Sequence, residues 1–395
     1  MAQKPIKRYY VDGHVHIGRS RSGSPIKMAA SSKLTIDNVI RAARYQKGLD
    51  GVGLIDAATI PVLGDIKQMI HESRLVEVAE GGFLAPTESV LLLPGAEVEL
   101  QGPVGGAAHF GVFVGTLSAL EELSRWLTFR QKNSTLSSQR TNASANELGA
   151  FVRELDGILI INHAFTPHKG LYGNCVRHMS EMIAEEYVTA VELGLSSDTN
   201  MADRLSELSS FSFVTNSDAH SVSKMGREYH VLALPELNFT AYREALRHPE
   251  WRQIALNVGL WPEMGKYHLS YCQSCGLRFD EAIHYCPNCN ETRIVQGVWN
   301  RLIAIADREE SISPDFRPPY LHQIPLEWIP GLGSKKLELL FHHFGSEMNI
   351  LNEVKLEDLV EAVGETLATE IDKARRGQLD FAPGAGGFYG QLRNS

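Results

Sequence analysis

Three apolar segments, far apart in the chain and rich in β-branched residues, each end in histidine or aspartate. They occupy residues 10–16, 158–163 and 213–220. Apolar runs of this length are typical of buried parallel strands. The carboxyl ends of such strands meet at the mouth of an α/β barrel, where side chains from several strands form one shared site. The pattern therefore favours a metal-dependent hydrolase over a set of structural histidines.

Length and composition bound what else the chain can be. Its 395 residues suffice for two or three domains, and 43% hydrophobic with 22% charged residues is an ordinary globular composition. Because we find neither the apolar stretch of a signal peptide nor a run of about 18 apolar residues, we expect a cytoplasmic protein without membrane contact. The net charge of −9 argues against a broadly basic nucleic-acid binder. Nucleic acid is still allowed, since bound cations would add local positive charge.

Composition divides the chain into three regions. Residues 1–262 alternate strand-like and helix-like segments, with a helix expected over 35–47, and this predicts an α/β domain. Residues 263–297 form a compact cysteine unit, and residues 298–395 show helical patterns. A polar stretch at 133–146 is predicted to be a surface loop, either a tolerated insertion or a functional lid.

Histidines and carboxylates flank the apolar segments in a way that one metal site would explain. His14 and His16 are two residues apart, so on a strand both side chains point to the same face. Glu97 follows an apolar strand, where a carboxylate is costly unless it is exposed or coordinating, and it can bridge two cations. The other flanking side chains are His109, His163, Asp218 and His220. Together they predict a polynuclear metal site.

In this order, these residues resemble the polymerase-and-histidinol-phosphatase (PHP) family over about residues 8–262. The resemblance implies an irregular (β/α)7 barrel with two or three divalent ions, which we expect to be Zn, Mn or Mg. The matched positions are His14 and His16 (first motif), Glu97 (bridging carboxylate), His109, His163 (fourth motif), and Asp218 and His220 (closing Asp-x-His).

Two departures from the family pattern affect one metal position. The second motif, usually Asp-His, is Asp56-Ala57 here, and a further expected histidine falls near Ser22. We therefore expect two firmly held ions and a third position that is weak, absent or differently ligated. Asp56 either binds metal or orients a water. Glu192 either supports a ligand histidine or forms a surface pair.

Four of the five cysteines form two Cys-x-x-Cys units, Cys272 with Cys275 and Cys286 with Cys289, separated by ten residues. Two such units close a tetrahedral zinc site that leaves no open position, so we expect one structural zinc and a reducing compartment. The metal would supply most of the stability of so small a unit. Cys175 is expected to be a packing or loop residue.

Residues 329–337 predict a helix, a Gly-x-Gly turn and a second helix. Gly331 and Gly333 allow close backbone approach, and Ser334 is expected to cap the second helix. Amides at that helix start suit a phosphate, and Lys335 and Lys336 add charge. The segment resembles the helix-hairpin-helix motif, which grips a DNA backbone without reading sequence. The alternative is a merely tight turn between helices.

The order of barrel, zinc unit and helical region with a hairpin resembles the endonuclease Q family. The loop His163-Ala-Phe-Thr-Pro-His168 agrees with that resemblance. It implies a nuclease that nicks damaged double- or single-stranded DNA on the 5′ side of uracil, hypoxanthine, xanthine or an abasic site, after base flipping. It assigns catalysis to Asp218, His220 and Glu97. Candidate DNA contacts near the site are His168, Lys169 and Tyr172.

Two other functions fit part of the sequence. A PHP-type phosphoesterase acting on a small phosphomonoester explains the metal ligands but leaves the zinc unit and hairpin without a role. A non-catalytic DNA-binding scaffold explains the losses at Ala57 and Ser22, but not the retention of the other ligands. No clear peptide for binding a sliding clamp stands out, so a clamp or another repair protein as partner is not derivable.

Overall fold

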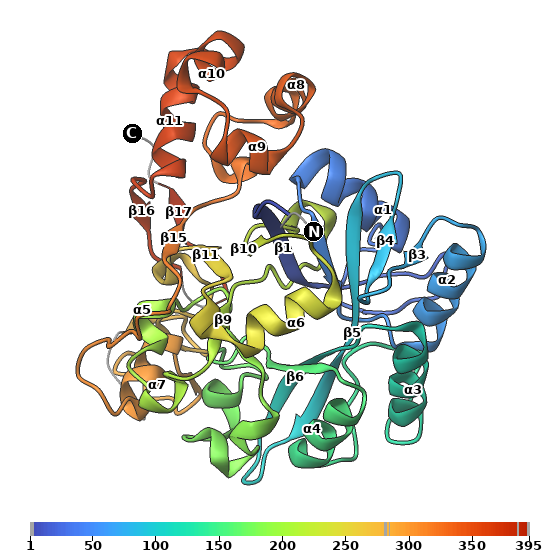
Figure 1. Cartoon of the computed structure of the whole chain (residues 1–395). Helices are drawn as coiled ribbons and strands as arrows, with labels where there is room; N and C mark the ends of the chain where they lie inside the picture. The colour runs from blue at the N-terminus through green and yellow to red at the C-terminus, as the bar shows by residue number, and fades with distance from the viewer. Residues whose placement is uncertain (1–3, 280–282, 284, 385–386, 393–395) are drawn as a thin grey trace.

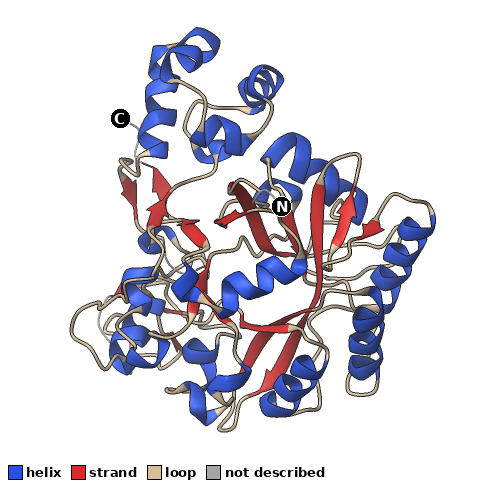
Figure 2. Ribbon diagram, in the orientation of Figure 1, coloured by secondary structure: helices blue, strands red, loops and turns tan. Residues whose placement is uncertain are grey.

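The chain folds into a curled mixed sheet with helices on its outside, a small cysteine unit at one side and a helical region at one end (Figures 1 and 2). A computed structural model describes residues 4–279, 283, 285–384 and 387–392. Within these ranges, every helix is too short or too polar to cross a bilayer. The α/β class expected for the first region is confirmed.

Twelve strands form the central sheet. They are β1 (Lys7–Val15), β2 (Gly51–Leu54), β3 (Val76–Glu77), β4 (Phe83–Ala85), β5 (Val90–Gln101), β6 (Ala107–Phe113), β7 (Ile158–Ile161), β8 (Ala190–Glu192), β9 (Ser212–Val214), β10 (Tyr229–Leu234), β11 (Ile254–Gly259) and β15 (Tyr320–His322). The order is β15-β11-β10-β1-β2-β5-β6-β7-β8-β9, and the short β3–β4 pair joins β5. A bridge between Val15 and Ala219 brings the end of β1 to the segment after β9, so the sheet curls back on itself.

Strand directions differ in part from the parallel arrangement that the sequence predicted. β1, β2 and β5 are parallel neighbours, as are β7, β8 and β9. In contrast, β6 is antiparallel to both β5 and β7, and β10 is antiparallel to β1 and β11. The reason at β6 is the short glycine-rich connection at 102–106, because a connection of that length can join only antiparallel strands.

β5 changes partners in its middle, and this change carries Glu97 to the mouth of the barrel. The strand is parallel to β2 as far as Pro94 and antiparallel to β6 from Gly95 onward. A Cβ atom at Gly95 would lie 2.3 Å from the carbonyl oxygen of Val112, so only glycine allows this close approach.

Helices cover the outside of the sheet, and buried aliphatic side chains fill the space between the layers. They are α1 (Ile36–Ala42), α2 (Ile60–His71), α3 (Leu117–Thr128), α4 (Ala145–Glu154), α5 (Thr199–Ala202) and α6 (Phe239–Arg247). The helix expected over residues 35–47 is confirmed. Thr35 caps it by accepting a hydrogen bond from the Asn38 amide, and a π-helical turn, Ala43–Lys47, continues it.

The cysteine unit contains a small antiparallel sheet of β12 (Ser270–Cys272), β13 (Arg278–Phe279) and β14 (Ile294–Val295). The next helix, α7 (Val298–Ile305), packs against α5 at the side of the barrel, apart from the later helices (Figure 1).

The later helices are α8 (Ser334–Phe344), α9 (Glu347–Asn352), α10 (Leu356–Val363) and α11 (Glu365–Arg375), followed by the short strands β16 (Phe381–Ala382) and β17 (Gln391–Leu392). They share a core of their own. Several contacts tie this region to the barrel. Strand β15 pairs with β11 at the edge of the central sheet, and the buried Lys47 Nζ lies 2.6 Å from Glu347 Oε2.

Candidate metal centre and nucleic-acid interface

Seven imidazole and carboxylate side chains converge at one end of the barrel. Their ligand atoms fall into three groups, each spanning no more than 4.8 Å: His14 with His16 and Glu97, His16 with Asp218 and His220, and Glu97 with His109 and His163. Glu97 and His16 each belong to two groups. This sharing is what adjacent cation positions bridged by one carboxylate require.

The backbone at two of these positions is unusual. His163 follows β7 and Asp218 follows β9, and their φ angles are +31° and +45°. Non-glycine residues adopt this region at a cost of about 1–3 kcal/mol, and such strain concentrates at functional sites. Both residues are therefore held in place by the surrounding structure rather than by their own preference.

Glu97 is the centre of the cluster. Its Oε1 atom lies 2.9 Å from His109 Nδ1, 3.4 Å from His14 Nε2 and 3.5 Å from His163 Nε2. Asp218 Oδ1 lies 3.4 Å from His16 Nε2 and 3.5 Å from His14 Nε2. All of these side chains except Asp218 are at most one-tenth exposed.

These residues fit divalent cations. The buried atoms His14 Nε2, His16 Nε2 and both ring nitrogens of His109 have no well-aligned hydrogen-bond partner among the described residues. Such atoms are costly to bury unless something satisfies them. Neutral imidazole nitrogens that face carboxylate oxygens are the donor set that Zn²⁺ and Mn²⁺ accept.

Two buried carboxylates hold the ligand histidines from behind. Glu192 Oε2 lies 3.0 Å from His14 Nδ1, and Glu192 also accepts a hydrogen bond from the His163 amide. Asp56 lies 3.1 Å from His16 Nδ1 and accepts from the Ile17 amide at 2.7 Å. This geometry fixes the ring orientation of a metal-ligating histidine.

The sequence left the roles of Asp56 and Glu192 open, as metal ligand or water-orienting group for Asp56 and as histidine support or surface pair for Glu192. The contacts favour support of a ligand histidine by both. Glu192 is buried, which rules out the surface pair. The metal-ligand role given to Asp56 does not fit its position, because its oxygens face the nitrogen of His16 that points away from the cluster.

Neighbouring imidazole and ammonium groups offset the effect of burial on the pKa values of the carboxylates in the cluster. Burial alone would raise the pKa of Glu97, but His109 and Lys27 beside it hold that pKa well below its usual value. The His109 imidazole, with Lys169 and Arg140, lowers the pKa of Glu99 to about 2, against the effect of burial. Burial lowers the pKa of His220 to about 4, so this imidazole is neutral at physiological pH.

The cluster opens onto a cavity of about 470 Å³. Its wall includes the ligands Asp218 and His220 together with the cationic side chains of Lys224, Arg227 and Lys266. Tyr389 from the C-terminal segment completes the wall: Arg227 donates a hydrogen bond to its hydroxyl at 2.6 Å, and Lys266 Nζ lies 4.7 Å from its ring centroid. The sequence analysis missed these side chains because they come from separate segments and share no spacing.

The three DNA contacts expected beside His163 occupy different environments. His168 lines the cavity, and its ring meets that of Tyr267 edge-on. Lys169 Nζ pairs with Glu99 at 2.6 Å and is partly exposed. Tyr172 is fully buried and stacks on Phe165, so the prediction that it contacts DNA is wrong. The turn that carries it directs the ring into the core.

The four predicted zinc ligands also lie together. Cys272 Sγ is 3.6 Å from Cys289 Sγ, and Cys275 Sγ is 3.5 Å from Cys286 Sγ. Four sulfurs bound tetrahedrally to zinc, each at about 2.3 Å, would lie about 3.8 Å from one another, close to the separations seen here. None of the four is in a disulfide, and Cys175 is buried in the main core.

The segment expected to be a helix-hairpin-helix differs from that expectation in two ways. Before the turn there is a single 3₁₀ turn, Leu326–Trp328, because Pro325 and Pro330 on either side leave no room for a longer helix. Ser334 is the first residue of α8 and makes no cap, since Gly333 takes the capping position.

The surface of this turn is nevertheless exposed. Its exposed residues are Gly331, Gly333, Ser334, Lys335 and Lys336. The buried Leu332 anchors the turn to the helical core.

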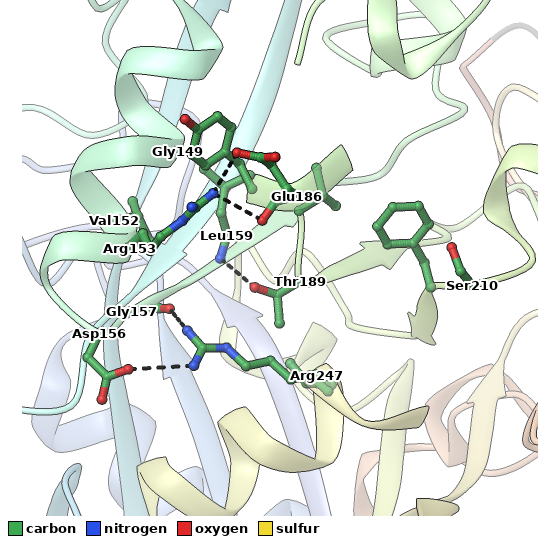
Figure 3. A pocket seen from close by; sticks show the side chains of 14 residues that line it. Gly149, Val152, Arg153, Asp156, Gly157, Leu159, Glu186, Thr189, Ser210 and Arg247 are labelled. Carbon is green, nitrogen blue, oxygen red and sulfur yellow. Dashed lines mark hydrogen bonds and ion pairs between the residues drawn. The ribbon is translucent and has the colours of Figure 1, made fainter. Parts of the chain in front are cut away.

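A second large cavity, of about 420 Å³, lies at the opposite ends of the strands, before β7, β8 and β9. Figure 3 shows that its charged side chains satisfy one another: Arg153 meets Glu186, and Arg247 reaches Asp156 and the Gly157 carbonyl. With its charges paired, this cavity lacks the unsatisfied ligand atoms found at the mouth.

Comparison with known proteins finds relatives of the chain, one of which matches nearly its whole length. It is 39% identical to the uncharacterized protein YqxK of Bacillus subtilis, over 98% of this chain and 100% of that one. An uncharacterized protein of Methanocaldococcus jannaschii is 36% identical over 224 residues, which cover 51% of this chain and 28% of that protein. No family model matches the sequence.

Solved structures give the family. The lesion-specific endonuclease PfuEndoQ of Pyrococcus furiosus superposes with a TM-score of 0.83 and 29% identity, over 98% of this chain and 95% of that one. An endonuclease Q complex with a 27-mer duplex carrying an abasic lesion at the active site has the same TM-score, 28% identity and coverage of 98% and 97%. The chain belongs to the endonuclease Q family.

Proposed function

We propose that this protein is a DNA repair endonuclease that hydrolyses the phosphodiester bond 5′ to a deaminated base (uracil, hypoxanthine or xanthine) or an abasic site. One observation carries the proposal: the ligand cluster opens onto a cavity of about 470 Å³ whose lining also includes cationic and aromatic side chains. A flipped nucleotide needs a pocket beside the reacting phosphate, and its phosphates need positive charge. The solved endonuclease Q complex holds abasic duplex DNA at its active site.

In this proposal the seven converging side chains hold two divalent cations, which supply an activated water and stabilise the charge of the phosphate. Asp218 is the ligand most exposed to the cavity, at 30%, so it also orients the attacking water. His220 completes the ligand group with His16 and Asp218, and its imidazole is neutral because burial lowers its pKa to about 4. Glu192 and Asp56 orient His14 and His16.

The other regions bind rather than cut. The four cysteines hold a structural zinc in a unit at residues 263–297, and the exposed turn before α8 contacts the DNA backbone through Lys335 and Lys336. Lys224, Arg227 and Lys266 face the phosphates beside the lesion. Such an enzyme works at the nucleoid, in the cytoplasm.

A nicking assay tests the proposal. End-labelled duplexes carry one deoxyuridine, deoxyinosine, deoxyxanthosine or abasic site, or no lesion, and are incubated with Mg²⁺ or Mn²⁺. We expect one cut 5′ to the lesion, lost in Asp218→Asn purified in the same way. Absence of cutting on every lesion duplex would contradict the proposal and direct attention to phosphomonoesters.

A further inference from the structure

Lys27 places an ammonium group inside the metal-ligand cluster. Its side chain is only 15% exposed, and its Nζ atom lies 3.0 Å from Glu97 Oε2. The two oxygens of Glu97 therefore face different partners. Oε1 faces the imidazoles of His14, His109 and His163, whereas Oε2 faces the ammonium, with His16 Nε2 farther away at 3.7 Å.

The polar loop at 133–146 closes over the same side of the cluster. Ser137 donates a hydrogen bond to Asp56, Ser138 donates to Glu97, and Lys27 donates to Ser138. A cavity of about 10 Å³, roughly the volume needed for the centre of one water molecule, lies beside these groups, and its lining includes Asp56, Glu97, Ser137 and Ser138. Of the two roles considered for this loop, a tolerated insertion does not account for two serine side chains that reach the site.

At the two positions where the PHP family has histidines for a third cation, this chain offers no imidazole. Ala57, which replaces the histidine of the second motif, is fully buried and offers no donor. The hydroxyl of Ser22 lies 2.9 Å from that of Ser20 and 3.4 Å from that of Ser24, within its own turn. Two carboxylates, Asp56 and Glu97, nevertheless remain here, and their charge needs compensation.

We propose that the Lys27 ammonium, held by Ser138, is a built-in cation that takes the place of a third divalent ion at the barrel mouth. This inference rests on the proposed metal-dependent function and deepens it. Lys27 is then a positioning residue: it fixes Glu97 Oε2, so that Oε1 points at the imidazoles. The site holds two ions because a lysine and two serines fill the third position.

Counting ions tests this directly. The probe is Mn²⁺, titrated into the full chain after mild chelation has cleared the barrel mouth, with free Mn²⁺ followed by electron paramagnetic resonance and residual zinc by mass spectrometry. We expect two Mn²⁺ per chain in the wild type and in Lys27→Arg, which keeps the charge. Lys27→Glu, which exchanges the cation for a ligand, should bind three.

A neutral variant gives a second measurement in case Lys27→Glu fails to fold. Lys27→Gln removes a positive charge that would repel a cation bound at Glu97. The affinity of the mouth for Mn²⁺ should therefore rise about tenfold or more. A lysine that merely contacts DNA would leave Mn²⁺ affinity unchanged, and that result would overturn the inference.

The possible failures can be told apart. Three Mn²⁺ in the wild type, together with lesion-dependent nicking, would overturn only the role of Lys27. No Mn²⁺ binding in the wild type would overturn both this inference and the proposed function.

Discussion

The barrel mouth and the cysteine unit are both clusters of metal-ligating side chains, and they differ in how they are closed. At the mouth, nitrogen and oxygen ligands from distant strands surround one buried carboxylate, and the cluster faces a cavity. In the cysteine unit, four sulfurs from one short segment face one another. An open coordination position is needed for chemistry, and a closed one gives stability. The comparison assigns cutting to the mouth and folding to the cysteines.

The largest effect should come from the shared carboxylate. Glu97→Gln removes the charge that two ligand groups use, so we expect nicking to fall by about a thousandfold or more, with loss of bound metal. The control is Glu99→Gln on the same strand, whose carboxylate lies near His109 but belongs to none of the three ligand groups, and which should cost about tenfold. If a time course shows the same loss of nicking rate in Glu97→Gln and Glu99→Gln, Glu97 is not the carboxylate that the ligand groups share.

The cysteine unit should respond in the opposite way. Cys272→Ser should remove one zinc per chain and expose residues 263–297 to proteolysis, because the metal supplies most of the folding energy of so small a unit. Hydrolysis of a small phosphodiester should persist. Cys175→Ala, a cysteine outside the cluster, should keep the zinc. If Cys272→Ser loses hydrolysis of the small phosphodiester and Cys175→Ala does not, the cysteine unit takes part in the chemistry, which would contradict a purely structural role.

The carboxylates that support the ligand histidines should change the metal affinity of the barrel mouth but not abolish metal binding. Glu192→Gln keeps the shape but removes the charge facing His14 Nδ1, so we expect metal affinity at the mouth to fall about 10–100-fold. Excess Mn²⁺ should restore nicking. If saturating metal leaves the variant inactive, Glu192 does more than orient His14.

The smallest effect should come from the exposed turn. Lys336→Ala should weaken DNA binding a few-fold, equally on damaged and undamaged duplex, and lower the salt slope by about one. Lys67→Ala, which removes an exposed charge on α2 where the side chain pairs with Glu121, is the matched control. A salt slope unchanged in Lys336→Ala would remove this turn from the DNA interface.

The sequence was most informative where a polar side chain interrupts or follows an apolar run. His14, His16, Glu97, His163 and Asp218 were found in this way, because burial makes such residues conspicuous. The signal was lost where residues are brought together only by tertiary structure. Lys27 and Ser138 lie in loops, and nothing local marks them as neighbours of Glu97.

The wrong expectations have the same origin. Tyr172 sits between a ligand and polar residues, and only its packing on Phe165 shows that it belongs to the core. The antiparallel direction of β6 depends on a five-residue connection, whereas the apolar pattern of that strand is the same in either direction.

The most direct test of the division between mouth and cysteine unit is to empty them separately. Mild chelation should clear the mouth while the cysteines keep their zinc, with both occupancies read by elemental analysis beside the nicking rate on an abasic duplex. We predict that nicking disappears when the mouth is empty and returns as about two Mn²⁺ per chain are added back. Nicking that persists with an empty mouth, or that follows only the loss of the cysteine-bound zinc, would contradict the account.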